Sequence, residues 1–279
     1  MISLSANVHE AISNNGPLWF PDLAEKLSRN WSASYDTALS SYSSSHFLSK
    51  GLLNQEASRS IKLNWTKTCT VIEVLHKHVQ QIYEQQGLVF ALTEEAIGHD
   101  TCHHIQEAFT TIEGVPSLYS ALSQLVQRIH VLRAENDEFD ISYSDPKLPF
   151  SVFVSVPATR QKYQAWRIAE GLIHEAMHLQ LSLIERVVPM VDKESHHRYY
   201  SPWRAVQRPI SGVLHGLYVF GVIYEWLSLI DSDHQYVRER RKEIKEEVNQ
   251  IKQFASSPGL TQHGGLLAAK AINMVLAKH

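Results

Sequence analysis

The sequence predicts a mainly helical protein with one small β-hairpin. Apolar residues recur at the three- to four-residue spacing of helices along most of the 279-residue chain. One segment departs from this spacing: residues 150–156 place valine or phenylalanine at every second position between two prolines, which is the period of a strand. The two cysteines, Cys69 and Cys102, are too few for a disulfide framework, which fits a reducing compartment.

Helical spacing and turn residues divide the first half of the chain. Helices are expected over 22–30, 70–86, 93–112 and 117–133. The Ser-rich residues 34–50 are typical of a loop, and Gly114-Val115-Pro116 marks a break between two of the helices. A charged connector at 135–138 ends this half.

The second half begins with the strand and continues as helices. Residues 150–156 are expected to pair with 139–143 as a hairpin. Helices are expected over 160–188, 209–230, 235–254 and 260–278. Pro209 suits the first turn of a helix, and the polar residues 189–206 are typical of a loop.

Composition excludes several classes of function. A net charge of −3 argues against general affinity for nucleic acid or for an anionic membrane. The absence of an apolar run of about 18 residues predicts that no helix spans a membrane. The first residues lack a basic region followed by an apolar core, so no secretion signal is expected. Together with the cysteine count, these features favour a cytoplasmic protein.

The pentapeptide His174-Glu175-Ala176-Met177-His178 lies within the helix predicted over 160–188. Two histidines four residues apart share one helix face, so both imidazoles can reach a single divalent ion beside the glutamate. With 16 histidines in the chain, a shuffled sequence shows this pattern roughly one time in fifteen. The alternative is that both histidines are exposed on an amphipathic helix and bind no metal. The flanking leucines and isoleucine make full exposure of this part of the helix unfavourable.

A metal centre needs a third protein ligand. The zinc-peptidase pattern H-E-x-x-H-x-x-G-x-x-H fails, because Leu181 and Ile184 stand where glycine and the last histidine are required. Glu194 and Glu225 are downstream carboxylates, but neither lies in the Asn-Glu motif that usually supplies this ligand.

His215 is the better candidate for the third ligand. It lies in a predicted helix that is apolar on nearly every side, and a histidine buried there needs a partner. Gly212 and Gly216 lack side chains on either side of it, which leaves room for a metal, a second helix or a ligand. The alternative is a core histidine bonded to a carbonyl group.

Three neutral imidazoles would leave the ion its full charge and open positions for water, a chelating acid or dioxygen. Glu175 would act as a general base on a bound water or as a partner that orients a ligand. Arg204 and Arg208 precede His215, and Arg208 lies about 10 Å before it along the axis if the helix begins near Arg208. Either guanidinium could bind the far carboxylate of a chelating diacid, or form a surface salt bridge instead.

Four segments in order resemble the HExxH-type peptide modification proteins, which are found beside ribosomally made, post-translationally modified peptides. These segments are 151–155, 169–178, 200–204 and 208–216. The family is understood as iron- and 2-oxoglutarate-dependent peptide β-hydroxylases. The resemblance implies Fe(II) on His174, His178 and His215, with Glu175 as a competitor for the third place. It further implies 2-oxoglutarate on Arg204 or Arg208.

The expected function is therefore an oxidoreductase that uses Fe(II), 2-oxoglutarate and dioxygen to hydroxylate the β-carbon of a side chain in a ribosomally synthesised precursor peptide. In this interpretation residues 1–135 form a helical region suited to peptide recognition and 136–279 carry the metal site, within two domains or one continuous domain. The alternatives are a zinc metallopeptidase with Glu175 as general base, and a non-catalytic peptide-binding protein. The target residue and the oligomeric state are left open.

Overall fold

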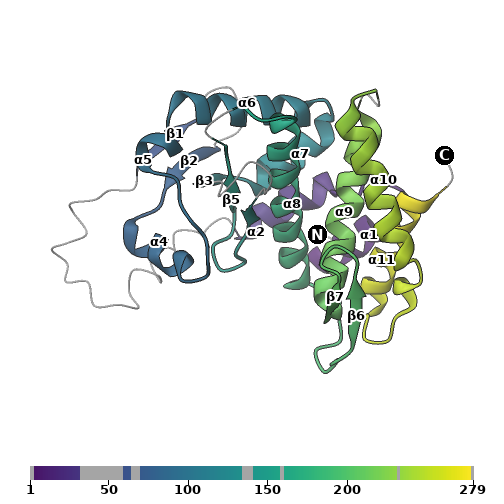
Figure 1. The fold of residues 1–279 in the computed structure, drawn as a ribbon. Coiled ribbons are helices and arrows are strands. Elements are labelled where there is room, and N and C mark those ends of the chain that lie inside the picture. The colour runs from purple at the N-terminus through teal and green to yellow at the C-terminus, as the bar shows by residue number, and fades with distance from the viewer. Residues whose placement is uncertain are drawn as a thin grey trace, which may run out of the picture. The chain divides into compact units, whose positions relative to one another are not determined.

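The computed structural model describes residues 3–31, 59–63, 70–133, 141–157, 160–230 and 233–277. Within these residues the protein is mainly helical, as the sequence predicts, and its strands form a five-stranded sheet and a separate two-stranded sheet (Figure 1). The loop expected over 34–50, Cys69 and the connector at 135–138 lie outside the described residues.

Two compact units make up the chain. We call Ser28–Leu179 the central unit, and Met1–Leu27 together with Gln180–His279 the bipartite unit. The helices α2 (Pro21–Trp31) and α8 (Gln164–Glu185) each contribute residues to both. The functional division proposed at residue 135 stays a prediction.

The central unit is built around the five-stranded sheet, whose order is β1-β2-β3-β5-β4. The inner strands β2, β3 and β5 are parallel, and the edge strands β1 and β4 are antiparallel to their neighbours. The pairing of β4 with β5 confirms the predicted hairpin. The strands are β1 (Arg59–Lys62), β2 (Val71–Val74), β3 (Arg128–Leu132), β4 (Ser142–Tyr143) and β5 (Ser151–Ser155).

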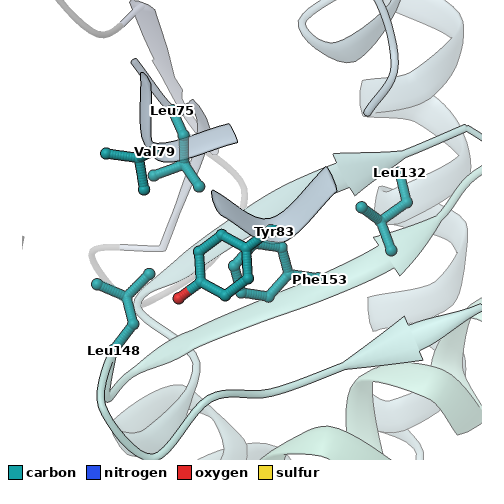
Figure 2. Packing of buried hydrophobic residues seen from close by; sticks show 6 residues of the cluster. All are labelled: Leu75, Val79, Tyr83, Leu132, Leu148 and Phe153. Carbon is teal, nitrogen blue, oxygen red and sulfur yellow. The ribbon is translucent and has the colours of Figure 1, made fainter. Parts of the chain in front are cut away.

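All five residues of β5 are buried, because helices cover both faces of this strand. On one face Phe153 packs against Tyr83 of α4 (Lys77–Glu84), with ring centroids 4.8 Å apart. Figure 2 shows this packing within the cluster formed by Leu75, Val79, Tyr83, Leu132, Leu148 and Phe153. On the other face Val154 approaches Gly171 of α8.

Two predicted helices of the central unit are wrong in part, since sheet pairing overrides helical spacing. Residues 71–74 form β2, because a short β-branched run can pair with strands on both sides, and α4 begins only at Lys77. The helix expected over 117–133 ends at Leu125 as α7 (Pro116–Leu125) and gives way to β3.

The helix expected over 93–112 is also divided. It consists of α5 (Thr93–Ala96) and α6 (His99–Glu113), with Gly98 between them. A Cβ at Gly98 would lie 2.8 Å from the carbonyl oxygen of Glu94, so the chain can turn here only because the residue is glycine. The predicted break before Pro116 is confirmed.

In the bipartite unit, α9 (Ile210–Leu229) lies at the centre, as Figure 1 shows. Both α10 (Gln235–Gln250) and α11 (Gln262–Leu276) pack against it, and α1 (Leu4–Ser13) packs against α11. A short 3-10 helix, η1 (Phe254–Ser256), joins α10 to α11. These helices confirm the ones predicted near 209–230, 235–254 and 260–278.

The predicted loop over 189–206 contains a strand that the sequence analysis missed. Residues 198–201 form β6 (Arg198–Ser201), which pairs with β7 (Val206–Pro209) as an antiparallel hairpin. The alternation is hidden because the less exposed positions hold Tyr199, Ser201 and Arg208 rather than aliphatic residues.

The helix α9 is long and apolar enough to cross a membrane by composition alone, the one such helix among the described residues. However, 72% of its apolar window is buried inside the fold. That burial is what the core helix of a soluble protein shows.

Candidate metal centre

The two histidines of the pentapeptide meet on α8. Their Nε2 atoms lie 3.1 Å apart, and the rings are 4.7 Å apart between centroids. When two imidazole nitrogens bind one divalent ion at about 2.1 Å each and occupy neighbouring coordination positions, the nitrogens lie about 3.0–3.4 Å apart. The pair therefore has the spacing of two ligands of one ion, and His174 is 25% exposed, which leaves it accessible from solvent.

Close packing of α8 on the sheet delivers Glu175 to β4. A Cβ at Gly171 would lie 3.4 Å from Val154 and 3.6 Å from the Cβ of Ser142, so the helix approaches the strand closely here. Glu175 follows one turn later on the same side of the helix.

Both carboxylate oxygens of Glu175 accept a hydrogen bond from a serine. The hydroxyl of Ser142 donates to Oε1 at 2.7 Å, and the hydroxyl of Ser144 donates to Oε2 at 2.6 Å. The Glu175 side chain is 5% exposed, and its Oε1 lies 3.9 Å from His174 Nε2, beyond hydrogen-bond distance. The sequence predicts a strand at Ser142 but carries no signal for this contact.

His215 lies on α9 in the bipartite unit and pairs with a residue that the sequence analysis missed. Its Nε2 is 3.1 Å from Oε2 of Glu185, the last residue of α8. A carboxylate that accepts one ring N–H of a histidine fixes the tautomer and turns the other nitrogen toward a metal. The contact fits a ligand that binds through Nδ1.

The gaps beside His215 hold side chains of the same unit. The guanidinium of Arg208 lies over Gly212, where a Cβ would be 3.3 Å from its Cζ. The indole of Trp203 covers Gly216, where a Cβ would be 2.7 Å from Cε3. The expectation that these glycines leave open room is thus corrected: they admit an arginine and a tryptophan.

The two candidate arginines, Arg204 and Arg208, have different surroundings in the structure. Arg204 is exposed in the turn of the β6–β7 hairpin, where its backbone N–H donates to the Ser201 carbonyl at 3.2 Å. Arg208 is half-buried on β7, and its guanidinium lies over Gly212, one helical turn before His215. Of the two arginines, Arg208 is therefore the one whose guanidinium lies against the helix turn that precedes His215.

The two downstream glutamates have other surroundings. Glu225 is buried in the bipartite unit and accepts the Leu18 N–H at 2.9 Å, and burial raises its pKa to about 7. Glu194 is exposed in the loop before β6.

Among the residues that the structure describes, no group of three or more His, Cys, Asp or Glu side chains is arranged so that it could hold a metal ion. The histidine pair belongs to the central unit and His215 to the bipartite unit. Two imidazole nitrogens at the observed spacing are donors that divalent transition metals prefer. The histidine pair on α8 therefore fits two ligands of one metal ion. Comparison with family models and with curated proteins finds no match to this chain.

Proposed function

We propose that this protein is a cytoplasmic Fe(II)- and 2-oxoglutarate-dependent oxidoreductase that hydroxylates the β-carbon of a side chain in a ribosomally synthesised precursor peptide. The observation that carries the proposal is the 3.1 Å separation of His174 and His178 Nε2 on one helix face. In this proposal His174, His178 and His215 would hold the iron, and Arg208 would hold the far carboxylate of 2-oxoglutarate.

Iron with 2-oxoglutarate and dioxygen would supply the oxidising chemistry. The chain's own residues would position the metal ligands and 2-oxoglutarate, and would keep water out of the site. Arg208 offers a planar, bidentate donor for a carboxylate, and its contact with Gly212 limits the directions it can take. Glu185 would orient the His215 ring, and the contact of Glu175 with Ser142 would hold the helix turn that carries the histidine pair. The peptide would be recognised in part by residues 1–135.

The alternative of a zinc metallopeptidase needs Glu175 as a base beside a metal-bound water. Ser142 and Ser144 engage both of its oxygens, which favours the oxygenase over the peptidase. The third possibility, a non-catalytic peptide-binding protein, requires that the protein take up no stoichiometric metal.

The proposal is tested by anaerobic reconstitution of the full chain with Fe(II) followed by 2-oxoglutarate. We expect one iron per chain and a visible charge-transfer band when 2-oxoglutarate binds. His174→Ala should lose both, whereas His196→Ala, an exposed histidine outside the proposed site, should keep both. Tightly held zinc with oxygen-independent peptide cleavage, or no metal at all, would overturn the proposal.

The choice of Arg208 has its own measurement. Arg208→Met should weaken the 2-oxoglutarate titration of this band by about 10- to 100-fold, because a hydrogen bond between charged groups contributes roughly 1.5–3 kcal/mol. Arg204→Met is the matched control and should shift the titration by less than about threefold. Reversed sensitivities would assign the role to Arg204.

A further inference from the structure

We infer that Ser142 and Ser144 hold Glu175 as a positioning residue for the histidine pair rather than as a base that acts on water. This inference rests on the proposed function, in which His174 and His178 bind a metal. It concerns residues of the central unit alone.

The contacts are those of a clamp on a carboxylate. Each oxygen of Glu175 receives its own hydroxyl, at 2.7 Å from Ser142 and 2.6 Å from Ser144. These distances match the short range of hydroxyl-to-carboxylate bonds, about 2.5–2.7 Å. Two separate donors fix the rotation of the carboxylate as well as its position.

The sheet register explains why Ser142 reaches this side chain. Ser142 pairs with Val154, which faces α8, whereas Tyr143 pairs with Phe153, which faces α4. Because side chains alternate along a strand, Ser142 extends toward α8. Ser144, the residue that follows β4, reaches the same carboxylate. Gly171 lies where α8 comes close to Val154 and Ser142, and Glu175 follows one helical turn later on the same side.

A base must direct an oxygen at the water it deprotonates. Glu175 instead directs one oxygen at Ser142 of β4 and the other at Ser144, which follows the strand, and its side chain is 5% exposed. What it offers the histidine pair is a fixed backbone turn and a negative charge 3.9 Å from His174 Nε2. Both effects favour a cation at the two nitrogens.

The experiment measures Co(II) affinity and the Co(II) absorption spectrum of the full chain, together with its thermal unfolding. The double variant Ser142→Ala/Ser144→Ala should weaken Co(II) binding by about 10-fold, the lower end of the loss for an outer partner of a metal ligand, because the serines act on the histidines only through Glu175. Ser151→Ala is the matched control, because Ser151 is a buried serine of the same sheet that bonds His130. It should lower the unfolding temperature without changing Co(II) affinity.

Glu175→Gln provides the decisive second variant. Its amide oxygen can accept from one serine and its amide nitrogen can donate to the other, so the clamp geometry is kept. We expect Co(II) affinity to fall by less than in the double serine variant, because the clamp is kept and only the negative charge is lost. Unchanged Co(II) affinity in the double serine variant would overturn the clamp. Loss of all turnover in Glu175→Gln with Co(II) still bound would make Glu175 a base. Failure of the wild-type protein to bind Co(II) would instead overturn the proposed function, and the positioning role with it.

Discussion

Two glycines on helices of this protein have opposite surroundings. A Cβ at Gly264, in the first turn of α11, would overlap the carbonyl oxygen of Met190, which is backbone and cannot rotate away. A Cβ at Gly171 on α8 would make ordinary contact with Val154 at 3.4 Å. Sequence alone does not distinguish them, because the difference lies in what packs on top.

We therefore expect Gly264→Ala to lower the free energy of unfolding by about 3 kcal/mol, at the upper end of the cost of overpacking. Gly171→Ala should be neutral or stabilise by up to about 1 kcal/mol, since alanine is the better helix former. Urea titration of the two variants measures both values. Equal losses in the two variants would show that the gap over Gly264 relaxes.

His130 on β3 is fully buried between two polar partners. Its Nδ1 is 2.9 Å from the Glu73 carbonyl and its Nε2 is 3.1 Å from the Ser151 hydroxyl. Burial lowers the pKa of the imidazole from 6.5 to about 4. Because the unfolded chain binds the proton more tightly, stability present above pH 6.5 is lost as the pH falls toward 4.

This shift corresponds to roughly 3 kcal/mol of unfolding free energy. His130→Gln keeps a donor and an acceptor but cannot titrate in this range. As the pH falls from 6.5 to 4, the free energy of unfolding should fall by roughly 3 kcal/mol less in the variant than in the wild type. Denaturant titrations at several pH values test this, and parallel pH profiles would contradict it.

At the level of single residues, the sequence identifies side chains whose chemistry is local and misses those whose role depends on contacts. The spacing of His174 and His178 follows from the period of a helix, so it could be predicted. Ser142 and Glu185 could not, because each acquires its role from a residue at least 30 positions away.

At the scale of elements, long amphipathic helices were predictable and short strands in a mixed sheet were not. The run at 71–74 fits both a helix and a buried strand, and only its neighbours β1 and β3 decide between them. The strand at 151–155 was found because prolines delimit it and its alternation is regular. Pairing partners distant in sequence carry the missing information.

The segment around Leu18 and Trp19 packs in the bipartite unit, although no sequence pattern predicts this. Tyr218 on α9 donates its hydroxyl to the Leu18 carbonyl at 3.0 Å and to Gln180 Oε1 at 2.6 Å. Gln180 in turn donates to the Trp19 carbonyl at 2.9 Å. Buried side chains thus satisfy the backbone of a segment that forms no helix or strand there.

Tyr218→Phe should destabilise the protein by about 1–3 kcal/mol, because it leaves buried acceptors without their donor. Tyr200→Phe is the matched control on the exposed face of β6, where the side chain is 41% exposed, and should change stability by less than about 0.5 kcal/mol. Thermal unfolding compares the two. Similar small effects in both would show that water replaces the Tyr218 hydroxyl.

At the scale of the whole molecule, the chain leaves the bipartite unit after residue 27 and returns to it at residue 180. Both crossings fall inside helices, α2 and α8, so no linker composition marks them. A boundary of this kind is invisible to an analysis that looks for loops between domains. The pentapeptide and His215 consequently belong to different units although the sequence analysis placed them in one region.

The two units should respond to acid in opposite directions. In the bipartite unit, burial raises the pKa of Glu225 from 4.5 to about 7, while the Leu18 N–H and Lys270 lower it. A raised carboxyl pKa means that the folded unit binds the proton more tightly. Its contribution is present in full below pH 4.5 and is lost as the pH rises through 7.

The Glu225 shift amounts to roughly 3 kcal/mol, opposite in sign to that of His130 in the central unit. Between pH 6.5 and 4.5 acidification should therefore strengthen the bipartite unit while it weakens the central one. Hydrogen exchange followed by mass spectrometry measures the stability of each unit separately. On acidification, protection from exchange should rise in α9 and α11 and fall in β3 and β5. Glu225→Gln still accepts the Leu18 N–H and should remove the rise while leaving the fall. Protection that falls together in both units, and does so equally in Glu225→Gln, would show that the two titrations are not separately coupled to the stability of their units.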